Sequence, residues 1–107
     1  MAFSMDNELI RALSDAFLCL EDRGECFKLL EDLFTVREMC DMAQRLEVAR
    51  MLSRHATYTE IAEKTGVSSA TIGRVNRALT YGAGGYRLVL DRLENKNVTE
   101  DKNDRSE

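Results

Sequence analysis

One stretch constrains the fold of this chain more than any other, residues 58–77 (YTEIAEKTGVSSATIGRVNR). Apolar residues with helical spacing lie on both sides of Gly66, so the stretch predicts two short helices joined at a sharp corner. The inward-facing residues are Ile61 and Ala62 on the first helix, Val67 at the elbow, and Ile72, Val75 and Leu79 on the second. The core is therefore expected to form around this pair of helices.

The residues at the helix ends support the same interpretation. Thr57 and Glu60 have the spacing of a capping box, and Ser68 is a good N-cap for the second helix. Gly66 lies at the corner, where a positive φ is common and a Cβ would resist it. Thr65 departs from the pattern, because an apolar residue is usual at that position.

With its apolar residues inward, the second helix has an outer face that is small, polar and cationic. The residues of this face are Ser69, Ala70, Gly73, Arg74 and Arg77. Such a pair is typical of a helix-turn-helix, whose second helix enters a DNA major groove. The alternative is an ordinary helix pair with a glycine between its members. Spacing, glycine, caps and outer face all agree, which favours the helix-turn-helix.

Length and composition exclude several classes of protein. A chain of 107 residues is expected to form one small domain, and its sequence has neither a membrane-length apolar run nor a signal-peptide pattern. Cys19, Cys26 and Cys40 are too few and too scattered for a disulfide framework, and His55 is the single histidine. We therefore expect a cytoplasmic protein with no metal, no cofactor and no enzymatic activity, since no nucleophile motif is present.

The charges are unevenly distributed along the chain. The net charge is -4, but residues 45–92 contain eight Lys and Arg against four acids, whereas the rest contains seven against fifteen. Salt screens distant acids beyond about 8–10 Å, so a locally basic segment can still bind phosphate. A solvated charged surface is the alternative, and it accounts less well for two arginines on one helix face.

The absence of proline and the abundance of helix formers predict an all-α fold. Residues 1–94 are expected to form a single helical domain. Within it we expect dimerisation helices over 6–54, the helix-turn-helix over 57–81 and a C-terminal helix over 85–94. Asp6 or Asn7 caps the first helix and Gly24 ends it, while Thr35 and Glu38 form the capping box of the longest helix.

The C-terminal part contains a glycine-rich stretch and a polar tail. Gly82, Gly84 and Gly85 predict a hinge rather than a phosphate loop, because no strand precedes them and no Gly-Lys-Ser/Thr ending follows. In the last helix Leu90 and Leu93 are expected to face inward. Residues 95–107 have one apolar residue and are expected to be disordered.

The two N-terminal helices are more apolar than a single stripe per helix requires. A neighbouring subunit could cover the surplus, and major-groove readers usually dimerise to span two half-sites. We therefore expect a homodimer through residues 6–54, the alternative being a monomer with an unusually rich core.

Residues 34–79 resemble the bacterial Trp repressor family, and the segments AQRLEVARML and YGAGGY are similar to the related YerC/YecD-type proteins. The resemblance covers about half of the chain well and implies an intertwined, six-helix homodimer. It also implies a DNA face made of Ser69, Ala70, Thr71 and Gly73, with Arg74 and Arg77 nearby and the amides after Ser68 available for phosphate.

The resemblance implies an effector pocket as well. Thr35, Arg45 and Arg74 are similar to the threonine and two arginines that hold tryptophan in the family, and two guanidinium groups can bind a carboxylate. The family's glycine after the second arginine is Val75 here, which could fill the indole space, so tryptophan is not expected to bind. Arg45 and Arg74 would then bind another effector, pair with acids such as Glu47, or contact phosphate, and Thr35 would be a helix cap.

These observations favour a sequence-specific, homodimeric DNA-binding transcriptional regulator of the repressor type, with double-stranded DNA as its partner. The alternative is a protein-protein interaction module that keeps the helix-turn-helix as a scaffold.

Overall fold

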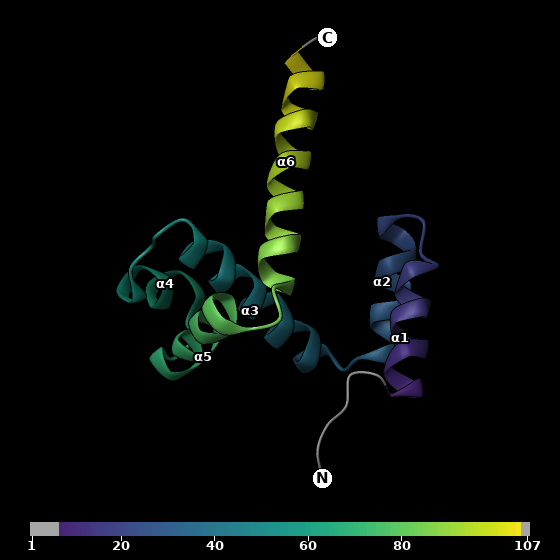
Figure 1. The fold of residues 1–107 in the computed structure, drawn as a ribbon, viewed down its shortest axis with the longest axis horizontal. Helices are drawn as coiled ribbons and strands as arrows, with labels where there is room; N and C mark the ends of the chain where they lie inside the picture. The colour runs from purple at the N-terminus through teal and green to yellow at the C-terminus, as the bar shows by residue number, and fades with distance from the viewer. Residues whose placement is uncertain (1–6, 106–107) are drawn as a thin grey trace. The chain divides into compact units, whose positions relative to one another are not determined.

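The computed structural model describes the backbone of residues 7–105 and the side chains of residues 7–96. Helices account for all of the regular structure in this part of the chain, so the predicted all-α, six-helix fold is confirmed (Figure 1). In chain order the helices are α1 Glu8–Leu18, α2 Arg23–Leu33, α3 Val36–Ser53, α4 Tyr58–Thr65, α5 Ser69–Tyr81 and α6 Gly85–Arg105.

The chain divides into two compact units, Met1–Met39 and Cys40–Glu107. The boundary falls within α3. The single helical domain expected for residues 1–94 stays a prediction. Helices α1 and α2 contain no buried residue, so the two helices form no core with each other within one chain. Its large exposed apolar side chains are Leu9, Phe17, Leu18, Phe27, Leu33 and Val36.

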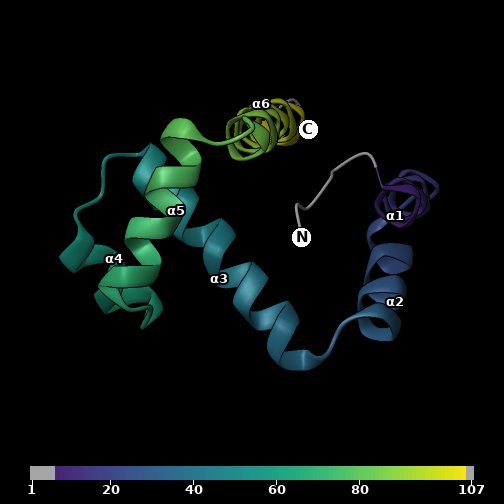
Figure 2. The same cartoon turned by 60° about the horizontal axis from the view of Figure 1, so that its bottom comes forward.

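The core of the C-terminal unit lies where α4 and α5 pack against the second half of α3 (Figure 2). Val48 and Ala49 of α3, Ile61 of α4 and Ile72 of α5 are fully buried there. Val75 and Leu79 extend the buried stripe along α5, and Leu90 joins it from α6. The inward residues predicted for the helix-turn-helix are thus confirmed, with Ala62 and Val67 packed at the margin.

Side-chain caps begin five of the six helices, because the first amides of a helix have no partner within it. The caps are Asn7, Asp22, Thr35, Thr57 and Ser68, each accepting a hydrogen bond from a backbone N–H two or three residues later. Glu38 completes the capping box of α3 by accepting from the Thr35 N–H at 2.9 Å. The prediction that Gly24 ends the first helix is wrong, because the Asp22 cap places Gly24 in the first turn of α2.

The corner between α3 and α4 depends on a residue that is not glycine. His55 has a φ of 66°, and its N–H donates to the carbonyl oxygen of Leu52 at 3.0 Å. The next amide, of Ala56, donates to the carbonyl oxygen of Met51 at 3.0 Å. This pair of bonds is a Schellman motif, in which a left-handed residue closes the end of a helix.

The corner between α4 and α5 has the predicted left-handed glycine, since the φ of Gly66 is 74°. The Thr65 hydroxyl donates to the Ile61 carbonyl oxygen at 2.7 Å and accepts from the Val67 N–H at 3.2 Å. Two backbone groups at the turn thereby gain partners. A polar residue at this position is therefore compatible with the corner.

Helix α5 ends at Tyr81, as predicted, and the glycine stretch separates it from α6. A Cβ at Gly82 would lie 2.3 Å from the Ala78 carbonyl oxygen, so the backbone itself excludes a larger residue there. Gly84 has a φ of 91°. These two positions require glycine for geometry, whereas the role of the stretch as a hinge stays a prediction.

Helix α6 differs from the prediction in length and in packing. It continues to Arg105 instead of ending near Glu94, because no glycine or proline follows Gly85 to interrupt it. Leu90 is buried as expected, but Leu93 is 45% exposed. Leu93 lies beside Arg50 and Ser53 in the last turn of α3.

Two glycines of the helix-turn-helix provide a matched test of the corner. Gly66→Ala should lower the free energy of unfolding by about 1–2 kcal/mol, because an L-residue is strained in the left-handed region. Gly73→Ala should raise it by about 0.5–1 kcal/mol, because Gly73 lies within α5 with open space around its Cβ position. Urea unfolding at equal protein concentrations measures both. Equal effects of the two substitutions would contradict the left-handed corner.

Candidate nucleic-acid interface

The buried stripe of α5 determines which of its residues face outward. Ile72, Val75 and Leu79 are held against α3, so the helix cannot rotate about its own axis without exposing them. Arg74 and Arg77 are exposed on the other side of the helix. The outer face of α5 is therefore fixed by the core beneath it.

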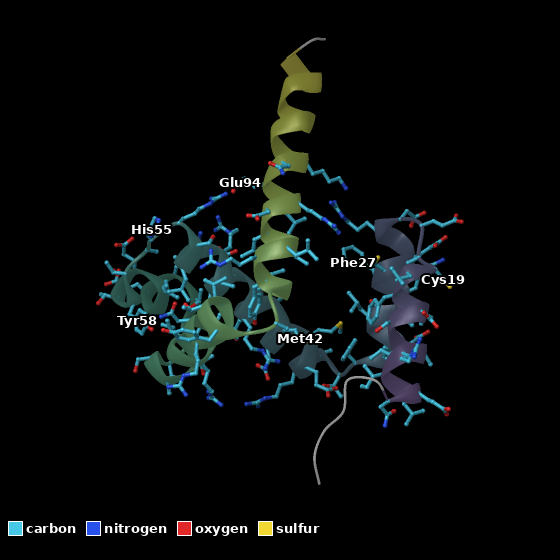
Figure 3. The ribbon with its side chains drawn as sticks, in the orientation of Figure 1. Cys19, Phe27, Met42, His55, Tyr58 and Glu94 are labelled. Carbon is cyan, nitrogen blue, oxygen red and sulfur yellow. The ribbon has the colours of Figure 1, made fainter. Side chains whose placement is uncertain are left out.

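A surface groove runs along this outer face and over the start of α4. Its lining residues are Tyr58, Ala70, Gly73, Arg74, Asn76, Arg77, Thr80 and Tyr81. The side chains of the set are small, hydroxylic, amide-bearing, aromatic or cationic, and none is acidic. Figure 3 labels Tyr58 in this region of α4. The groove thus has the chemistry of a surface that receives an anionic polymer.

The structure separates the residues that the sequence assigned to DNA binding into two sets. Ala70, Gly73, Arg74 and Arg77 line the groove, and Ser68 and Ser69 are exposed at the start of α5. Thr71 is half-buried, where its hydroxyl accepts from the Ser68 hydroxyl at 3.1 Å. It lines a second pocket, the inner cavity, rather than the groove.

Sequence reasoning missed the residues that border the groove from outside the recognition pattern. The amide Nδ2 of Asn76 donates to the Tyr58 hydroxyl at 3.3 Å, which links α5 to α4. These residues are 18 apart in the chain, so no local pattern predicts their contact. Tyr81 is 83% exposed at the C-terminal end of α5. Its aromatic side chain is a sequence signal that could have identified a residue of this border.

The inner cavity is a surface pocket between α3 and α5 with a volume of about 220 Å³, and Asp41, Gln44, Arg45 and Arg74 in its lining are exposed. It brings together Arg45 and Arg74, which the resemblance assigned to an effector pocket. The other lining residues are Asp41, Gln44, Val67, Thr71 and Val75. Thr35 belongs to the N-terminal unit, where it caps α3 and its hydroxyl accepts from the Glu38 N–H at 3.1 Å.

Two features of this cavity act against a tryptophan-like ligand. Val75 is 3% exposed and belongs to the core, so its isopropyl group is a fixed part of the cavity wall. Asp41 contributes a carboxylate to the same wall, which opposes a second carboxylate there. The cavity wall therefore contains two arginines, Arg45 and Arg74, beside the apolar Val75 and the acidic Asp41.

Glu47 is engaged by residues other than Arg45 and Arg74, so the suggested pairing with those arginines is wrong. Its carboxylate accepts from the Arg50 Nε at 2.9 Å and from the Arg50 Nη2, and it lies 3.6 Å from the Lys64 Nζ. The hydrogen bonds from Arg50 lower the pKa of Glu47, and the charges of Arg50 and Lys64 act in the same direction. One of the few acids in the basic segment is thus neutralised locally.

Arg45, Arg74 and Arg77 have no such partner in the part of the chain whose side chains are described. No carboxylate there lies within 4.0 Å of any of their nitrogen atoms. A guanidinium without an internal ion pair can bind a phosphate without first breaking one. These three arginines are therefore available to an external anion.

Metal and membrane sites are not found in the described residues. No three His, Cys, Asp or Glu side chains among them gather as metal ligands would. No helix within the same range has the length and apolar character needed to cross a membrane.

The fold and this sequence match known proteins over most of the chain. Residues 8–94 match the family described as Trp repressor protein. The chain is 48% identical over 82 residues to the uncharacterised protein YerC of Bacillus subtilis, covering 77% of this chain and 79% of YerC. It is 37% identical over 82 residues to the Trp operon repressor homolog of Chlamydia trachomatis serovar L2, covering 72% and 87%.

A solved structure supports the same relationship. The TrpR-like protein from Eubacterium eligens superposes with a TM-score of 0.81 at 47% identity, covering 84% of this chain and 93% of that one. The agreement at this identity extends beyond the fold to the sequence of the shared elements.

The pairing of Glu47 predicts a particular dependence of stability on pH. Because the folded state lowers the pKa of Glu47 from about 4.5, the carboxylate stabilises the fold above that pH. This contribution is lost as the pH falls below it. Glu47→Gln should therefore be less stable than wild type at pH 7, with the difference shrinking toward pH 3 in urea unfolding.

Glu63→Gln, an exposed glutamate on α4, is the matched control and should show a much smaller change with pH. A Glu47→Gln difference that stays constant from pH 7 to pH 3 would contradict the ion pair with Arg50.

Proposed function

This chain belongs to the Trp repressor family, and from that premise we propose that it is a sequence-specific DNA-binding regulator of transcription. The proposed partner is double-stranded DNA, with α5 entering the major groove and α4 crossing the backbone beside it. A repressing role and a cytoplasmic location are parts of this proposal.

The observation that carries the proposal is the outer face of α5. Arg74 and Arg77 are exposed on it without internal ion pairs, and Ala70 and Gly73 line the same groove with small side chains. Small residues let a helix approach base edges closely, while the arginines provide phosphate or guanine contacts. The absence of an acid from the groove lining removes the main source of repulsion.

A homodimer is the proposed assembly. In one chain Leu9 is 79% exposed, Leu18 83% and Phe27 58%. Helices α1 and α2 therefore expose an apolar surface to water, which is unfavourable. A second copy would bury this surface through the same helices. Two-fold symmetry would then place the two α5 helices on half-sites about 34 Å apart along the DNA.

Tryptophan is not the proposed corepressor. Val75 occupies the position after Arg74 that the resemblance assigns to ligand space, and it is held there by the core. Arg45 and Arg74 remain available in the cavity for a different effector or for a DNA phosphate. DNA binding without tryptophan is therefore part of this proposal.

Substitution of the two arginines tests the DNA face. Arg74→Ala and Arg77→Ala should each weaken binding to genomic DNA by about tenfold or more, since a charge-assisted hydrogen bond contributes about 1.5–3 kcal/mol. If the lost contact is to a phosphate, the slope of log K against log salt should also fall by about one unit. Fluorescence anisotropy over a salt series measures both quantities.

Arg92→Ala removes an exposed arginine from α6 and is the matched control, with affinity expected within about twofold of wild type. Unchanged affinity in both α5 variants would contradict this placement of the DNA face. No binding by wild type even at low salt would favour the protein-interaction module instead.

A further inference from the structure

Tyr58 is the first residue of α4, and it lines the same groove as Arg74 and Arg77. Its side chain remains 41% exposed, so the residue is not buried in the core beneath it. Its hydroxyl oxygen is 3.3 Å from the Asn76 Nδ2 of α5, which donates the hydrogen bond. The phenol is thereby tethered between the two helices of the helix-turn-helix.

The direction of this hydrogen bond determines what the hydroxyl can still do. A phenol hydroxyl has one proton to donate and two lone pairs that accept. Because Asn76 occupies an accepting position, the proton of Tyr58 remains to be donated. In a groove with two arginines and no acid, the acceptor that fits best is an anionic oxygen.

We propose that Tyr58, held in place by Asn76, donates a hydrogen bond to a phosphate oxygen of the DNA that lies against α5. This inference rests on the proposed function and adds a phosphate-binding residue on α4 to the arginines of α5. Tyr58 contacts the DNA, and Asn76 is a positioning residue that acts through Tyr58. Because the tether restricts the ring before binding, less side-chain entropy is lost when DNA binds.

The proposed contact has a signature that differs from that of the arginines. Tyr58 is neutral, so its hydrogen bond replaces no condensed counterion on the DNA. A phosphate contact also contains no base information. Loss of the hydroxyl should therefore weaken binding equally for specific and non-specific sequences and leave the salt slope unchanged.

The first variant is Tyr58→Phe, which keeps the ring and removes only the hydroxyl. We expect about tenfold weaker binding, which corresponds to about 1.4 kcal/mol. The measurement is fluorescence anisotropy with full-length protein and two duplexes, one selected from the genome and one of scrambled sequence, over a salt series. The circular dichroism spectrum and the urea midpoint of each variant establish that it is folded.

The role of Asn76 is tested by a double-mutant cycle. Asn76→Ala should weaken binding in the wild-type background, because the phenol is no longer held. In the Tyr58→Phe background the same substitution should have little further effect, since no hydroxyl is left to position. Tyr86→Phe is the matched control, because Tyr86 lies on α6 and does not line the groove. Its affinity should stay within about twofold of wild type.

The outcomes separate this inference from the function on which it rests. Wild-type binding together with an unchanged affinity for Tyr58→Phe would overturn the inference and leave the proposed function standing. Additive effects of Tyr58→Phe and Asn76→Ala would overturn the positioning role of Asn76, and an equal loss in Tyr86→Phe would overturn the assignment of the contact to Tyr58. If wild type binds neither duplex at low salt, both the proposed function and this inference fail.

Discussion

The packing of α4 and α5 on α3 is the interaction on which the rest of the C-terminal unit depends. Ile61 and Ile72 are fully buried against Val48 and Ala49, and full burial of one such aliphatic side chain contributes about 1.5–3 kcal/mol. By comparison, the ion pair between Glu47 and Lys64 is 3.6 Å long with Lys64 largely exposed, so it adds little. The apolar contacts therefore hold the helix-turn-helix, and they fix which side of α5 faces outward. The polar groups at the surface are placed by this core.

The local distribution of charge in this protein differs from what its net charge suggests. The chain is acidic overall, yet the groove on α5 is lined by arginines and contains no acid. Glu47, an acid of the basic segment, is paired with Arg50 of α3 and Lys64 of α4. Since salt screens charges that lie beyond about 10 Å, the local surface governs the encounter with phosphate. An acidic chain can therefore present a cationic face.

The sequence predicts the features that depend on short-range chemistry. Caps such as Thr57 and Ser68, the left-handed Gly66 and the end of α5 at Tyr81 follow from residues within a few positions of one another. The features that the sequence does not predict depend on contacts between residues far apart in the chain, or on the absence of a residue that would end a helix. The bond between Tyr58 and Asn76 spans 18 residues, and the length of α6 follows from the absence of any interrupting residue. For the candidate site, four of the predicted DNA-binding residues line one groove, while Thr71 lines the inner cavity and its hydroxyl accepts a hydrogen bond from the Ser68 hydroxyl.

The central claim is that two copies of α5 read DNA without tryptophan. It is tested most directly by incubating purified full-length protein with fragments of the source genome and sequencing the bound fragments, with and without tryptophan. The account predicts enrichment of a palindromic site, with half-sites about one helical turn apart, to the same degree in both conditions. Enrichment that requires tryptophan would contradict the role given to Val75, and no enrichment in either condition would contradict the DNA-binding function itself.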